Sequence, residues 1–186
     1  FITGLQRHVM CSVKHFAVNN TEDTRMNVNA VVDERTLREV FIPHFKKCID
    51  VGAACVMSSY NHVNGPKAGQ NKHLIHDILK TEWKWDGFVV SDWFTAMNDT
   101  VEAGNAGLDL EMPQARYYGK KLTDAVKAGK VPESAIDDSV SRMIRQLLRF
   151  VGPDFTSGYD QAKIAGTDHA AVAREAAEKG SVLLKN

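Results

Sequence analysis

The stretch Gly87-Phe88-Val89-Val90-Ser91-Asp92-Trp93 decides the fold class of this chain. Its apolar run is too short for a helix and rich in β-branched residues, which is typical of a fully buried strand. The run ends abruptly at Asp92, an ionisable carboxylate followed by an aromatic residue. In α/β proteins, binding and catalytic groups lie where parallel strands end. The stretch therefore predicts a parallel sheet with a functional carboxylate at its carboxyl edge.

The same pattern of a short apolar run ending in polar residues occurs four times. The predicted strands cover residues 9–13, 53–57, 88–91 and 108–112. Helical patterns separate them, and this alternation indicates right-handed βαβ units and a parallel sheet. No glycine-rich phosphate turn follows any predicted strand, so half of a (β/α)8 barrel is favoured over a doubly wound sheet. The chain has 186 residues, whereas a complete barrel takes about 250.

Capping residues and breaks in the apolar pattern mark the predicted helices. Asp33 is expected to cap a helix that Pro43 kinks or divides into two consecutive pieces and that Gly52 ends, and Asn71 to cap the next one. Further helical patterns lie near 96–103, around 122–126, over 136–148 and over 167–179.

Composition excludes several classes of function. The 23 basic and 23 acidic residues give a formal charge of zero, so no basic excess argues for nucleic acid or an anionic membrane. Apolar runs fall short of the roughly 20 residues that a membrane span takes. The three cysteines have neither CxxC nor zinc spacing and are interpreted as free thiols. His73 and His76, with Asp77 beside them, lack an HExxH context, so no metal site is expected.

Polar side chains follow each of the predicted strands. Lys14 and His15 end the first, Tyr60 follows the second, Asp92 ends the third and Glu111 the fourth. In a parallel barrel these ends open on one face, so we expect the side chains to form a pocket. Glu111 either lines that rim or caps a loop.

Each candidate also has a structural interpretation. Asp92 could be a nucleophile or general base, or a helix cap. Trp93 could stack on a substrate ring or pack in the core. Lys14 and His15 could donate hydrogen bonds to hydroxyl groups, or be a surface lysine and a satisfied histidine. Arg25 could pair with a neighbouring acid, pair with a catalytic carboxylate, or remain a solvated loop charge.

Six motifs occur in order along nearly the whole chain. They are Lys-His-Phe-Ala at 14–17, the polar loop that runs to Arg25, Val-Asp-Glu-Arg-Thr-Leu-Arg-Glu at 32–39, Val-Met-Ser-Ser-Tyr-Asn at 56–61, Gly-Phe-Val-Val-Ser-Asp-Trp at 87–93 and Ala-Gly-Leu-Asp-Leu-Glu-Met-Pro at 106–113. Together they resemble the glycoside hydrolase family 3 β-glucosidases.

The resemblance implies a retaining, exo-acting β-glycosidase that removes terminal β-D-glucosyl residues. The acid of the Ser-Asp-Trp motif, Asp92, is implied to be the nucleophile that forms the glycosyl–enzyme ester. Lys14 and His15 are implied to bind sugar hydroxyls, and Tyr60 to lie close to the nucleophile. The other substrate-binding residues implied are Met57, Trp93 and Arg25. The expected partner is a β-glucoside or oligosaccharide, with no cofactor.

The family also carries parts that this sequence lacks, namely earlier barrel strands and a second, α/β-sandwich domain that supplies the acid/base glutamate. The final Ser-Val-Leu-Leu-Lys-Asn resembles the entry to that domain. We therefore expect an internal fragment, with the C-terminal barrel half at 1–152, a linker at 153–168 and the start of the sandwich at 169–186. Alone it is expected to be inactive and only marginally able to fold, because half a barrel leaves unpaired edge strands. The compartment stays open.

Other activities remain as alternatives. β-Xylosidase activity within the family is open, because the residues that set pocket size are absent. The β-N-acetylglucosaminidase subtype is set aside, because Ala17-Val18-Asn19 stands where those enzymes carry Pro-Gly. Two other classes are a Schiff-base lyase that uses Lys14 and a carbohydrate-binding protein without turnover.

Overall fold

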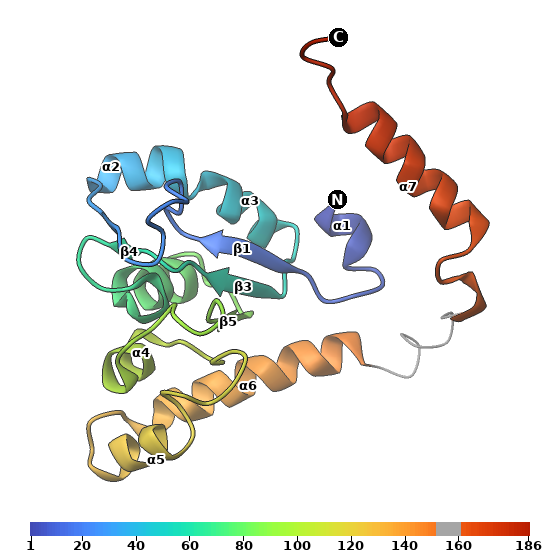
Figure 1. The fold of residues 1–186 in the computed structure, drawn as a ribbon. Coiled ribbons are helices and arrows are strands. Elements are labelled where there is room, and N and C mark those ends of the chain that lie inside the picture. The colour runs from blue at the N-terminus through green and yellow to red at the C-terminus, as the bar shows by residue number, and fades with distance from the viewer. Residues whose placement is uncertain (152–160) are drawn as a thin grey trace. The chain divides into compact units, whose positions relative to one another are not determined.

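The computed structural model describes residues 1–151 and 161–186 (Figure 1). The described chain forms two compact units, Phe1–Phe150 and Val151–Asn186. The first unit contains the strands, and the second contains the helices η4 (Gln161–Lys163) and α7 (Thr167–Gly180). Of the linker predicted at 153–168, residues 153–160 lie outside the described part of the chain.

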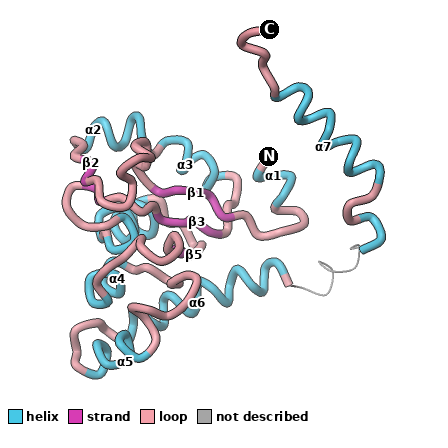
Figure 2. The backbone as a smooth tube through the Cα atoms, in the orientation of Figure 1, coloured by secondary structure: helices cyan, strands magenta, loops and turns pink. Residues whose placement is uncertain are grey.

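A three-stranded parallel sheet forms the centre of the first unit (Figure 2). Its strands are β1 (Ser12–Phe16), β3 (Cys55–Ser58) and β5 (Phe88–Val90), with β3 in the middle. A separate parallel pair joins β2 (Asn29–Ala30) to β4 (His62–Val63). The predicted α/β class with a parallel sheet is confirmed.

Helices connect the strands and cover the sheet, with α3 beside β1 and α6 beside β5 (Figure 1). In the first unit they are α1 (Ile2–Leu5), α2 (Glu34–Thr36), η1 (Leu37–Phe41), α3 (Pro43–Asp50), η2 (Ala68–Gln70), η3 (His73–Glu82), α4 (Thr100–Ala106), α5 (Lys120–Lys127) and α6 (Glu133–Phe150). The segments η1 and η3 are π-helical, and η2 is a short 3-10 helix. The helix predicted near 96–103 begins and ends later than expected.

Local side-chain chemistry sets the helix starts. The Asp33 carboxylate accepts the Thr36 N–H at 2.9 Å, and the Asn71 side-chain oxygen accepts the Leu74 N–H at 3.1 Å. Both are predicted caps and both are confirmed, since such oxygens satisfy donors that a helix leaves free. Pro43 begins α3, which Ile42 separates from η1, so of the two predicted outcomes the division into consecutive helical pieces is confirmed.

Two predicted strands are wrong in detail. The first begins at Ser12 and includes Lys14 and His15, and its register against β3 shifts between Val13 and Phe16. Residues 108–112 form no strand in the described structure, only one parallel bridge between Val90 and Leu110.

The core lies between the sheet and its helices. Phe16 packs edge-on against Phe45 of α3, with ring centroids 5.0 Å apart. The helix η3 buries a complete apolar face in the same core, formed by Leu74, Ile75, Ile78 and Leu79. Burial of a side chain of this size contributes about 1.5–3 kcal/mol, so this face is a large part of the stability of the first unit.

Helix α6 presents an unexpected face to the sheet. Several of the apolar residues that predict the helix are exposed, among them Ile144 and Leu148, whereas Gln146 is buried. The side chains of Gln146 and Arg142 donate to main-chain carbonyls of the segment before β5, including the Asp86 carbonyl. Polar contacts therefore orient this helix. Among the described residues, none of the helices combines the length and apolar character that crossing a membrane requires.

Candidate active site

The carboxyl ends of the three strands bring Asp92 and His15 together. Asp92 follows β5, and only 7 % of its surface is exposed. Its main-chain N–H donates to the Ser58 hydroxyl at the end of β3, 3.4 Å away. The His15 Nε2 atom, from β1, lies 3.4 Å from Asp92 Oδ2. This is the convergence expected of strands in one parallel sheet, whose carboxyl ends share one edge, although β3 lies between β1 and β5.

The two oxygens of the Asp92 carboxylate differ in their surroundings. Oδ1 accepts the N–H of Trp93 at 2.7 Å. Oδ2 is buried and has no hydrogen-bond partner among the described residues. A buried carboxylate oxygen normally has a partner, because leaving it unsatisfied costs about 1–3 kcal/mol or more. Asp92 is thus fixed by one oxygen while the other is available to a ligand.

His15 is half-buried beside this oxygen. Burial lowers the pKa of its imidazole, Asp92 opposes that change, and the positive charges of Lys14 and Arg25 reinforce it. The ring is therefore neutral at neutral pH, and one of its nitrogens can donate a hydrogen bond while the other accepts.

The His15 pKa provides a test of this arrangement. We expect an NMR titration to give a midpoint below the ordinary value of 6.5, and the substitution Asp92→Asn to lower it further by removing a nearby negative charge. Since the folded-state pKa lies below the unfolded value, the stability contributed by neutral His15 is present above pH 6.5 and is lost as pH falls through the folded pKa. A midpoint that Asp92→Asn raises would contradict the proximity of the two groups.

Lys14 and His15 also line a cavity of about 340 Å³. Its other polar walls include Asn19, Asn20 and Glu22 from the loop after β1. Asp92 is not among the lining residues of this cavity. The structure thus places His15 at both the cavity and the carboxylate, and the exposed Lys14 at the cavity alone.

Tyr60 and Arg25 form a stacked pair near Asp92. The Arg25 guanidinium lies 5.2 Å from the centre of the Tyr60 ring and forms an ion pair with Glu22 at 2.9 Å. Of the predicted alternatives for Arg25, pairing with a neighbouring acid is the one observed. Burial raises the pKa of the Tyr60 phenol, and the Asp92 carboxylate raises it further. Tyr60 therefore remains a neutral donor beside a carboxylate.

Trp93 and Met57 are partly accessible. Trp93 is 47 % exposed and meets Phe94 edge-on, with ring centroids 6.3 Å apart, so it does not pack in the core. Met57 is half-buried in β3, where it pairs in register with Val90. Trp93 directly follows Asp92 in the sequence, and Met57 lies on β3 opposite Val90 of β5.

Glu111 caps a loop. Its carboxylate accepts the main-chain N–H groups of Arg116, Tyr117 and Tyr118, at 2.7–3.1 Å. Of the two predicted roles, capping is the observed one. With its oxygens engaged in this way, Glu111 stabilises the loop after the Val90–Leu110 bridge.

Sequence reasoning missed Lys67, which is only 7 % exposed. Its ammonium donates to the carbonyls of Met26, at 3.0 Å, and Tyr60, at 3.1 Å, and so ties the loop that carries Arg25 to the Tyr60 main chain. Lys67 follows a Gly-Pro pair, which predicts a loop but gives no sign of burial.

The histidines considered as metal ligands have other partners. His73 Nε2 contacts Glu34 at 2.9 Å, and His76 Nδ1 contacts Asp77 at 2.9 Å. In the part of the chain that the structure covers, no three His, Cys, Asp or Glu side chains form a group suited to a metal ion.

The fold and this site define an α/β protein with a polar cluster at the carboxyl edge of a parallel sheet, where enzymes of this architecture bind substrates. Residues 1–146 match the glycosyl hydrolase family 3 N-terminal domain, and the chain belongs to that family.

Relatives with curated names are β-glucosidases. The chain is 40 % identical to thermostable β-glucosidase B of Acetivibrio thermocellus, over 100 % of this chain and 24 % of the relative. It is 41 % identical to a β-glucosidase of Rhizobium radiobacter, over 100 % of this chain and 23 % of the relative. The chain thus spans about a quarter of the length of these relatives.

Solved structures agree with this assignment. DesR, a β-glucosidase from Streptomyces venezuelae solved with D-glucose, has a TM-score of 0.83 and 38 % identity over 96 % of this chain and 24 % of its own. β-Glucosidase 3B from Thermotoga neapolitana, solved with glucose, has a TM-score of 0.85 and 36 % identity over 100 % of this chain and 27 % of its own.

Proposed function

We propose that this chain carries the nucleophile of a retaining, exo-acting β-glucosidase. The observation that carries the proposal is the Asp92 carboxylate, which is buried at the sheet edge and has one oxygen without a partner among the described residues. Oδ1, held by the Trp93 N–H, fixes the orientation of the group, and Oδ2 attacks the anomeric carbon. The bond to the leaving oxygen breaks as that oxygen is protonated, and water later hydrolyses the glycosyl ester.

The remaining site residues bind and orient the sugar. Lys14 and His15 donate hydrogen bonds to sugar hydroxyls, and Tyr60 donates one near the nucleophile. Trp93 and Met57 supply apolar walls, and their partial exposure supports this role. Arg25 acts through Tyr60, on which it stacks. Glucose is the proposed glycone, since the relatives quoted above are named β-glucosidases.

The proton donor is proposed to lie outside this chain. The carboxylate of Glu111 is engaged by three main-chain N–H groups and is unsuited to the task. We further propose that residues 1–152 form the C-terminal half of a (β/α)8 barrel, 153–168 a linker and 169–186 the start of an α/β sandwich that brings the acid/base glutamate. The sequential parallel order β1-β3-β5 supports the barrel half. Without these partners, residues 1–186 alone are expected to be inactive.

A mechanism-based label tests this function. The complete polypeptide that contains this chain is incubated with 2-deoxy-2-fluoro-β-D-glucosyl fluoride, and we expect one fluoroglucosyl group per site, attached to Asp92 in the peptide map. Borohydride reduction in the presence of a carbonyl substrate should leave Lys14 unmodified, in contrast to a Schiff-base lyase. Hydrolysis of an aryl β-glucoside without a label on Asp92 would overturn the proposal.

A further inference from the structure

A buried ion pair lies behind the segment that carries Asp92. The Asp109 carboxylate, whose side chain is 0 % exposed, accepts from the Lys80 ammonium at 2.7 Å, and the Lys80 side chain is 5 % exposed. Isolated charges at such positions are costly, so each of these groups depends on the other. Neither the strand pattern nor the proposed sugar site accounts for this pair.

Asp109 holds the strand β5 directly. Its second oxygen, Oδ2, accepts the Val89 N–H at 2.7 Å, and its own N–H donates to the Val89 carbonyl at 3.0 Å. The side chain thereby takes the acceptor position that a carbonyl of a neighbouring strand would fill. This substitution explains why residues 108–112 form a single bridge in place of the predicted strand.

Further hydrogen bonds join the two segments closer to the proposed nucleophile. The Leu110 carbonyl accepts the Ser91 N–H at 2.9 Å, and the Ser91 hydroxyl accepts the Met112 N–H at 2.9 Å. Hydrogen bonds therefore join residues 109–112 to β5 and its continuation from Val89 to Ser91, the residue before Asp92. Val89 lies three residues before Asp92 on this hydrogen-bonded segment.

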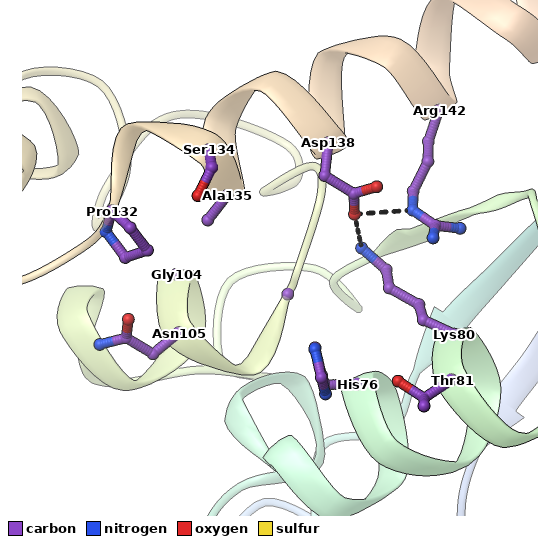
Figure 3. Close-up of a pocket in the computed structure, with 11 residues that line it drawn as sticks. His76, Lys80, Thr81, Gly104, Asn105, Pro132, Ser134, Ala135, Asp138 and Arg142 are labelled. Carbon is purple, nitrogen blue, oxygen red and sulfur yellow. Dashed lines mark hydrogen bonds and ion pairs between the residues drawn. The ribbon is translucent and has the colours of Figure 1, made fainter.

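Lys80 is fixed from its other side by α6. Figure 3 shows the Asp138 carboxylate between the Lys80 ammonium and the Arg142 guanidinium, with nitrogen–oxygen distances of 3.2 and 2.8 Å. Asp138 bonds to Lys80, whereas Asp109 bonds both to Lys80 and to Val89 of β5. The two acids thus offer a matched comparison on the same lysine.

We propose that Lys80 and Asp109 are positioning residues for the glycosylation step, because they fix the position of β5 and hence the orientation of the Asp92 carboxylate. The inference rests on the proposed function of Asp92. Neither residue touches the sugar. A displacement of about 1 Å at a reacting group can cost about 10²-fold in rate, so a small loss of alignment is sufficient for a measurable effect.

The test separates alignment from folding by measuring two quantities in the complete polypeptide. The stoichiometry of labelling by 2-deoxy-2-fluoro-β-D-glucosyl fluoride counts folded sites, and the labelling rate constant reports how well the Asp92 carboxylate is oriented for attack. For Asp109→Ala we expect stoichiometric labelling with a rate constant about 10- to 100-fold lower, and an unchanged inhibition constant for glucose. For Asp138→Ala, the matched comparison, the decrease should be smaller than for Asp109→Ala, because the bond from the Val89 N–H to Asp109 stays in place.

Two further variants keep the inference falsifiable if Asp109→Ala folds poorly. Lys80→Met alone should slow labelling, because it leaves a buried carboxylate unpaired. The double variant Asp109→Asn with Lys80→Met should restore much of the rate, because an amide oxygen can still accept the Val89 N–H with no unpaired ammonium beside it. Equal labelling rates in the wild type, Asp109→Ala and Lys80→Met would overturn the positioning role alone. An unlabelled wild type would overturn the proposed function itself.

Discussion

Turnover of an aryl β-glucoside should fall by about 10⁴-fold or more when Asp92 is replaced by glycine, because the substitution removes the atom that forms the covalent bond. The environment of the site should survive the loss of both carboxylate oxygens, since Oδ2 has no hydrogen-bond partner among the described residues and Oδ1 accepts the N–H of the adjacent Trp93. The measurement is kcat for the complete polypeptide with a substrate that bears a good leaving group.

A chemical rescue makes this prediction specific. Azide can enter the space left in Asp92→Gly and attack the anomeric carbon from the face that the carboxylate uses, so the product should be an α-glycosyl azide. The matched control is Asp86→Asn, because Asp86 is an exposed acid just before the other end of β5. That variant should keep the wild-type rate. A loss confined to Asp86→Asn, or a β-configured azide product, would contradict the assignment of Asp92.

The second large effect concerns stability. Replacing Gly87 with alanine is expected to lower the free energy of unfolding by about 3 kcal/mol, although alanine normally costs little at an ordinary backbone conformation. A Cβ atom at this position would lie 2.2 Å from the Trp85 ring and 2.5 Å from the Ala54 carbonyl oxygen. Trp85 has little freedom to move, since it is buried and its indole N–H donates to the Ala53 carbonyl at 2.8 Å.

Urea unfolding of the complete polypeptide, followed by tryptophan fluorescence, measures this effect. The urea midpoint for Gly87→Ala should be lower than that of the wild type, because a smaller free energy of unfolding at an unchanged slope lowers the midpoint. Gly4→Ala is the control, because Gly4 lies in α1 with no atom within 4 Å of the added methyl group. Its midpoint should be unchanged or higher. A midpoint for Gly87→Ala equal to that of the wild type would show that the contact with Trp85 can relax.

The order of elements could be predicted from sequence because it depends on local signals. The apolar run before Asp92 identifies β5, and Asp33 and Asn71 mark helix starts through oxygens that bond to N–H groups three residues on. That His15 and Asp92 lie at the same edge also follows, because the strands of one parallel sheet place their carboxyl ends together. These inferences need no knowledge of how distant segments pack.

Features that depend on tertiary contacts could not be predicted. The strand expected at 108–112 is lost because a side chain, Asp109, takes the place of a strand carbonyl. The orientation of α6 is set by Gln146 and Arg142 bonding to main-chain carbonyls, which apolar periodicity does not record. The register shift between Val13 and Phe16 of β1, where Lys14 and His15 lie, likewise has no signature in their residue types.

The contacts of Lys67 have a consequence for behaviour in salt. Its charge is buried and meets neutral carbonyl groups, so dissolved ions screen this attachment of the loop only weakly. The Arg25–Glu22 pair on the same loop is exposed to solvent, and its attraction declines as ionic strength rises. Concentrated electrolyte should therefore weaken the Arg25–Glu22 pair, while the bonds from Lys67 to the Met26 and Tyr60 carbonyls persist.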